Sequence, residues 1–147
     1  MSSQLNVDTI VDKAGSGGTN VKIGNTSTYV SDGGAVTQNT VQGLAKVWCR
    51  WELSGTASIE NSYNITSLTD VGTGLSTLTI ANDFSDTKYS ATMGAGEIAG
   101  GGNRQIGMRG SSGLTATVGT ISFFHMDLGS GAQDMDLNNL TMHGDLA

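Results

Sequence analysis

Two His-x-Asp pairs are the residues of this chain best suited to chemistry: His125-Met126-Asp127 and His143-Gly144-Asp145. Alternate residues of a strand share a face, so each pair could ligate a metal or relay a proton. A metal site needs three or four converging ligands, and each pair supplies two. We therefore interpret both histidines as hydrogen-bonded or solvated side chains and predict no metal site. A site completed by three histidines on a threefold axis stays the alternative.

Hydrolytic chemistry lacks its usual sequence signatures. There is no Gly-x-Ser-x-Gly motif, and the segment 110–113, Gly-Ser-Ser-Gly, is typical of a turn. Glu52, Glu60 and Glu97 could supply the carboxylate pair of a glycosidase. Two tryptophans and three tyrosines, however, leave few rings to line a sugar-degrading groove. The glycine clusters lack the spacing of a phosphate-binding loop. We predict that the protein is not an enzyme and binds no cofactor.

Composition limits the partners of the chain. A net charge of −6, with 7 Lys and Arg, argues against nucleic-acid binding, which needs a basic face. No run approaches the roughly 18 apolar residues of a membrane span, so we expect no membrane insertion. With 22 glycines and 37% hydrophobic residues, the chain has few large side chains for a core, and burial between subunits is expected to supplement it.

The segment 46–80 predicts the start of an antiparallel β-sandwich. Its odd-numbered residues from 47 to 53 are apolar and alternate with Trp48, Arg50 and Glu52. Successive side chains of a strand point to opposite faces, so we place the odd-numbered residues in the core. The single cysteine, Cys49, is then a buried, unreactive thiol. Trp48 falls on the opposite face beside two charges, and a neighbouring subunit would cover it.

Further alternating segments predict about eight strands, arranged as a jelly-roll-like sandwich over residues 45–147. For the strand at 121–128 there are two choices of core face: Phe123, His125 and Asp127, or Phe124, Met126 and Leu128. We choose the second set because it is more apolar. The predicted homotrimer interface therefore consists of outward-facing side chains: Trp48, Arg50, Phe123 and His125.

Residues 1–44 are predicted to be an extended arm and linker. Two short alternating pieces cannot bury a core of their own, and we expect them to dock on another protein through Leu5, Val7, Ile10, Val11, Val21 and Ile23. Helix-like spacing from Val36 to Leu44 allows a short trimeric neck, with an irregular linker as the alternative. The glycine-rich stretch 94–103 predicts an exposed binding loop, with Glu97, Ile98 and Asn103 as its contact residues.

Two stretches carry a resemblance to known proteins. After the tryptophan-bearing strand, the run SYNITSLTDVGTG (62–74) and the later Asp-Thr-Lys-Tyr at 86–89 resemble the C-terminal domain of many bacteriophage tail fibres, especially from marine phages. The opening segment LNVDTIVDKAG (5–15) is similar to the N-terminal stretch of the same proteins.

The resemblance implies a non-enzymatic virion structural protein that works as a homotrimer. In a tail-fibre-like knob, the exposed loop would contact the host, with a surface glycan as its ligand, and the arm would join a tail protein. The alternative is a capsid decoration (cement) protein, trimeric on the head surface, whose N-terminal arms clamp the major capsid protein.

Overall fold

The computed structural model describes residues 28–30, 37–40, 43–96, 102–109 and 117–147. The regular elements in these residues are all strands, and every pairing between them is antiparallel. The all-β prediction is therefore confirmed. The chain divides into two compact units, Met1–Gly43 and Leu44–Ala147, one residue before the predicted boundary. The described part of the chain contains no helix that could cross a membrane.

The first unit contains one described hairpin. Strand β1 (Thr28–Val30) pairs with β2 (Thr37–Asn39), with Tyr29 opposite Gln38. Gly43 N donates to Asn39 O at 2.9 Å. Residues 37–39 are thus extended, and the helical neck considered for this stretch is wrong there. The six predicted docking residues between Leu5 and Ile23 lie outside the described residues.

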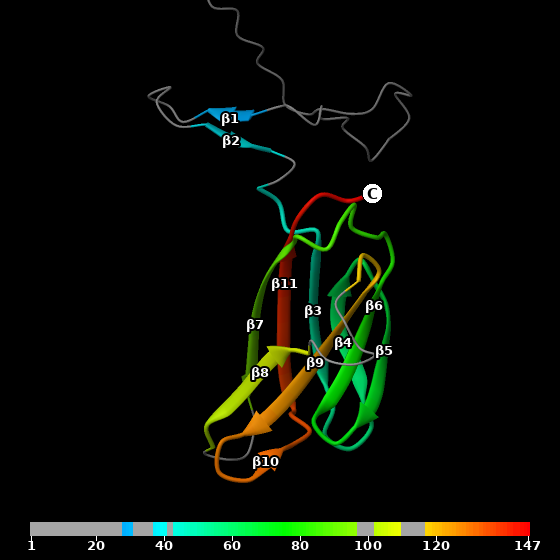
Figure 1. Cartoon of the computed structure of the whole chain (residues 1–147), viewed down its shortest axis with the longest axis vertical. Coiled ribbons are helices and arrows are strands. Elements are labelled where there is room, and N and C mark those ends of the chain that lie inside the picture. Colours follow the sequence, from blue (N-terminus) through cyan, green and yellow to red (C-terminus); the bar gives the residue numbers. More distant parts are fainter. Residues whose placement is uncertain (1–27, 31–36, 41–42, 97–101, 110–116) are drawn as a thin grey trace, which may run out of the picture. The chain divides into compact units, whose positions relative to one another are not determined.

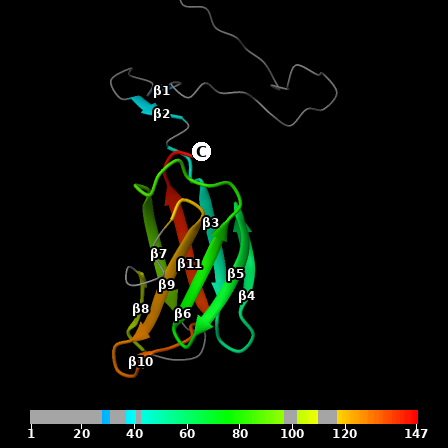
Figure 2. The same ribbon diagram turned by 45° about the vertical axis from the view of Figure 1, so that its right-hand side comes forward.

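The second unit is a sandwich of two sheets, which Figures 1 and 2 show as facing layers. The first, called the β3 sheet, has the order β4 (Ser58–Tyr63), β3 (Val47–Glu52), β11 (Leu137–His143) and β7 (Ser90–Gly96). The second, called the β9 sheet, joins β5 (Ile65–Gly72), β6 (Leu75–Ile80) and β9 (Thr120–Asp127), with β8 (Arg104–Met108) and β10 (Gly131–Ala132) also pairing with β9. Consecutive strands pair as β3–β4 in the first sheet and β5–β6 in the second, and the predicted jelly-roll-like order stays a prediction.

The core lies between the two sheets and follows the predicted alternation of β3. Val47, Cys49 and Trp51 are buried, whereas Trp48 and Arg50 are exposed. The Trp51 ring packs against Phe123 of β9, with 5.2 Å between ring centroids. Cys49 is 3% exposed, which confirms the predicted burial, and this burial raises the pKa of its thiol to about 12. Trp51 and Phe123 thus join the two sheets at the centre of the core.

The core face predicted for β9 is wrong. Phe123 is 0% and His125 1% exposed, whereas Phe124 is 38% and Leu128 57% exposed. Hydrophobicity favoured the other face, but the buried polar side chains have partners: His125 bonds to Ser76 and Asp127 pairs with Arg104. Buried polar groups with such partners cost little. Phe123 and His125 therefore lie inside the subunit and not on a surface available to a trimer interface.

Asn64 divides the predicted second strand into two strands that belong to different sheets. Its φ of 61° lies in the left-handed region, between the end of β4 and the start of β5. Its Nδ2 donates to Lys46 O at 3.2 Å and to Asn82 O at 3.1 Å, while its Oδ1 accepts from Asn82 N at 2.7 Å. Asparagine tolerates this backbone region better than most residues. The side chain thus fixes the crossing from one sheet to the other.

Candidate functional site: a groove between the two sheets

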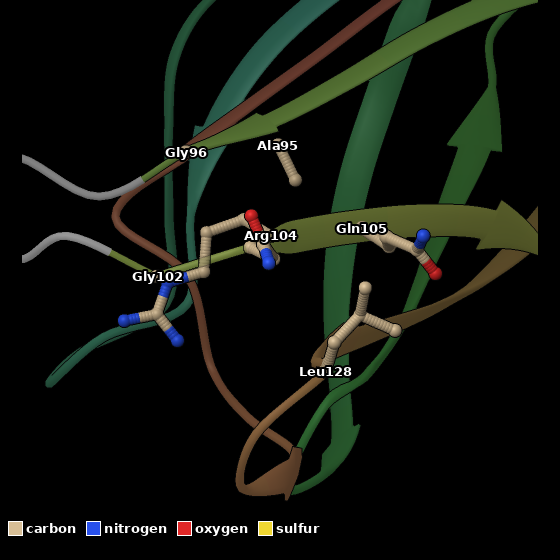
Figure 3. A pocket seen from close by; sticks show the side chains of 7 residues that line it. Ala95, Gly96, Gly102, Arg104, Gln105 and Leu128 are labelled. Carbon is tan, nitrogen blue, oxygen red and sulfur yellow. The ribbon is translucent and has the colours of Figure 1, made fainter.

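A groove of about 630 Å³ opens between β7 of one sheet and β8 of the other (Figure 3). Its lining combines small residues with a few polar side chains and one leucine: Ala95, Gly96, Gly102, Asn103, Arg104, Gln105 and Leu128. An adjoining pocket of about 410 Å³ shares Ala95, Arg104 and Gln105 and adds Phe124. Among the described strands, β7 pairs only with β11 and β8 only with β9. The groove therefore follows an open side of the sandwich.

The groove lies at the end of the sandwich opposite the point where the chain enters. Near the entry, Lys46 N donates to Met142 O at 2.8 Å. Phe84 forms an isolated antiparallel β-bridge with Leu146, close to the C-terminus. At the other end of β11, Leu137 pairs with Gly96, which lines the groove. Figure 1 shows the C-terminus at one end of this unit and β10 at the other. A ligand in the groove would thus bind far from both chain ends of the sandwich.

An ion pair between Arg104, which lines the groove, and Asp127 lies beside it. Arg104 Nη1 lies 2.6 Å from Asp127 Oδ2, both side chains are only 12% exposed, and Arg104 also donates to Gln133. Asp127 Oδ1 accepts from Gly129 N at 2.6 Å and Ser130 N at 3.1 Å. The Gly129 bond, followed by the Arg104 charge and Ser130, lowers the pKa of the Asp127 carboxyl below 3.8 against the effect of burial. The pair carries no net charge.

A second polar cluster, called the buried network, lies in the core beside Trp51 and consists of Ser76, His125 and Asn138. Ser76 Oγ is 2.9 Å from His125 Nε2. Asn138 Nδ2 donates to Trp51 O at 3.2 Å and to Met135 O at 3.0 Å. Burial lowers the pKa of His125 from 6.5 to about 4, although Asn138 and the charge of Asp134 act in the opposite direction. The imidazole is therefore neutral at pH 7.

The buried network has the residue types of a nucleophile, a base and an orienting amide, but not their accessibility. Ser76 and His125 are each 1% exposed and Asn138 is 0% exposed. A nucleophile must come within bonding distance of a substrate, and a hydroxyl enclosed between two sheets does not. Within the described residues, no three His, Cys, Asp or Glu side chains converge as metal ligands. The network is therefore a buried part of the core and not a reaction site.

The outer face of the β3 sheet carries an aromatic pair, Trp48 and Tyr63. The two residues are register partners on β3 and β4, 38% and 55% exposed respectively. Arg50 forms an ion pair with Glu60. Trp48 and Arg50 thus lie on an exposed face as predicted, while their role in an interface stays a prediction. Of the three candidate carboxylates, Glu60 pairs with Arg50, Glu52 accepts from Ser58 Oγ at 3.1 Å, and Glu97 lies outside the described residues.

One of the three contact residues predicted for the binding loop lines the groove. Asn103 lines the groove, while Glu97 and Ile98 lie outside the described residues. Sequence reasoning did not select Arg104, Gln105 or Leu128 as site residues. The one indication in the sequence was that Arg104 and Gln105 directly follow the glycine-rich stretch, where a strand begins.

Comparison with protein-family models, with curated proteins and with solved structures found no match for the chain. Its function must therefore be inferred from its own residues and geometry, together with the sequence resemblance described above.

Proposed function

We propose that this protein is a non-enzymatic structural protein of a bacteriophage particle, a trimeric fibre-like knob that attaches the virion to its host. The observation that carries the proposal is that the two ends of the sandwich differ. The chain enters and ends at one end of the unit, and a partly polar groove opens at the other. An adhesive knob needs this arrangement, because its connection to the particle and its contact with the host must not compete for one surface.

The trimer is the second part of the proposal, and the aromatic pair supports it. Trp48 and Tyr63 lie next to each other on a sheet face, where three copies of the chain would cover them. Burying an aromatic side chain fully stabilises by about 1.5–3 kcal/mol. Trp and Tyr are also enriched in the centres of protein interfaces.

We expect the purified protein to have three times the 15.1 kDa mass of the chain in light scattering. Trp48→Arg should shift the mass to that of the monomer, because it places three like charges where the rings would meet. Val71→Arg is the matched control, since it introduces the same charge and Val71 is 43% exposed on β5 of the other sheet. Two results would contradict an interface at the aromatic pair: a wild-type protein with the mass of one chain, or a Val71 variant that is monomeric while the Trp48 variant stays trimeric.

The first unit is proposed to join the knob to the particle. Tyr29 and Val30 of its hairpin are 66% and 50% exposed, as expected of residues that another protein covers. The same observation favours the second candidate function, a decoration protein held on the head through its N-terminal arms. In both cases the protein is located in the virion, and its partner is a tail protein or the major capsid protein.

The location on the particle separates the two functions. Gold-labelled antibody against the sandwich should mark the tail, whereas marking of the whole head surface would identify the decoration protein. Deletion of residues 1–24 should leave a folded trimer that no longer joins particles. Incorporation at the wild-type level would remove the docking role from the arm, and labelling of neither head nor tail would refute a virion location.

A further inference from the structure

We propose that the groove binds a neutral, hydroxyl-rich glycan through the side-chain amides of Asn103 and Gln105 and the apolar side chain of Leu128. The inference rests on the proposed adhesive function and adds to it the chemical class of the ligand and the residues that recognise it.

Charge in and around the groove selects against anionic ligands. Arg104 is the charged residue in the lining described above, and Asp127 lies 2.6 Å from it. An anionic sugar would have to displace this carboxylate, and separating an ion pair whose side chains are 12% exposed leaves a largely buried charge without its partner. The net charge of −6 also repels polyanions at long range. The groove is therefore suited to an uncharged ligand.

The remaining lining offers the groups that a sugar needs. Asn103 and Gln105 are both exposed, so their side-chain amides are open to solvent and to a ligand. Each amide provides both donors and an acceptor, which matches the dual character of a hydroxyl group. Leu128, 57% exposed, supplies an apolar surface for the C–H face of a sugar ring.

The backbone holds these groups in one place. Leu128 N donates to Asn103 O at 3.1 Å, which joins the start of β8 to the end of β9. Figure 3 shows the amide of Gln105 and the guanidinium of Arg104 extending in opposite directions from β8. Gln105 is thus separate from the ion pair and available to a ligand.

The dimensions favour a glycan over an extended peptide. A volume of about 630 Å³ is within the usual range of small-molecule sites, roughly 300–1,000 Å³. A peptide that adds to a sheet needs a run of backbone groups along an edge. β7 contributes Ala95 and Gly96 to the groove and Met93, Gly94 and Ala95 to the adjoining pocket, which is still a short edge for such pairing. In the proposed trimer, three grooves would bind a repeating polysaccharide with avidity gains of about 10²–10⁴.

The test is NMR of the ¹⁵N-labelled full-length protein, titrated with neutral oligosaccharides of glucose, galactose and mannose and with anionic fragments of hyaluronan and heparin. At least one neutral series should shift the side-chain amide signals of Asn103 and Gln105. Its affinity should be unchanged between 50 and 300 mM salt, since no net charge is involved. Gln105→Ala should weaken binding about tenfold by removing hydrogen bonds to the ligand. Gln38→Ala, the same change in β2, should leave the affinity unchanged.

Two results would overturn the proposal: preferential binding of the anionic fragments, or no binding by any of the sugars tested. Sugar-induced shifts centred on Trp48 and Tyr63 would overturn the groove as the site but leave an adhesive role in place. The labelling of particles tests the virion function separately from the sugar titrations.

Discussion

Lowering the pH from 7 to 4 is expected to reduce the free energy of unfolding by about 3 kcal/mol through His125 alone. Its pKa is about 4 in the folded protein and 6.5 when exposed to water. The folded state thus disfavours the charged imidazole, and the stabilisation it provides is complete above pH 6.5. It is lost as the pH falls toward 4, and each pKa unit corresponds to about 1.4 kcal/mol.

Urea unfolding at pH 7, 6, 5 and 4, at one fixed protein concentration, measures this loss. The matched variant is His125→Gln, whose amide can still bond to Ser76 but does not titrate. We expect the variant to be less stable at pH 7 and to lack the steep decline between pH 6.5 and 4. Equal slopes in the two proteins would show that His125 is not the titrating group. Asp127 contributes little to this decline, because the stability provided by a carboxyl of lowered pKa is lost only as the pH falls through its ordinary pKa of 3.8 toward the lowered pKa.

Asn64→Ala is expected to destabilise the sandwich by about 3 kcal/mol. Alanine in the left-handed region costs roughly 1–2 kcal/mol. The variant also loses four side-chain bonds, to Lys46 O, Asn82 O, Asn82 N and Asn82 Nδ2, each with a net value of about 0.5 kcal/mol because most of them are exposed. Because these bonds hold the crossing between the sheets, the loss should appear as a lower urea midpoint with an unchanged m-value.

Asn64→Gly separates the two contributions. Glycine adopts a φ of 61° without strain, so this variant should recover about 1–2 kcal/mol of the loss while still lacking the four side-chain bonds. If both variants unfold at the same urea concentration, the backbone contribution is absent. If the alanine variant is as stable as the wild type, Asn64 does not hold the crossing.

The prediction from sequence succeeded where a strand has one clearly apolar face. In β3, every odd-numbered residue from 47 to 51 is apolar and buried, and the alternation left no competing register. In β9 both faces are mixed, and hydrophobicity alone favoured Phe124, Met126 and Leu128. The deciding contacts come from distant strands: Ser76 and Arg104 supply partners for His125 and Asp127, and a pattern within one strand contains neither.

The groove could be predicted only in part for a similar reason. The glycine-rich stretch indicated a binding loop, and Asn103 at its end does line the groove. Arg104 and Gln105 belong to an edge strand, and their exposure depends on which strands β7 and β8 pair with. Leu128, which directly follows β9, reaches the groove because the opposite face of β9, with Phe123 and His125, packs in the core. Pairing order between strands far apart in sequence is not encoded in any local pattern, so these residues had no separate signal.

The sealed thiol of Cys49 makes the protein a convenient carrier for chemical reporters. With its pKa raised to about 12 and its side chain 3% exposed, it presents almost no thiolate to a maleimide at neutral pH. A cysteine introduced at an exposed position would then be the single reactive sulfur in the native chain. Fluorophores or spin probes can thus be attached to intact molecules one site at a time, without first removing the natural cysteine from the core.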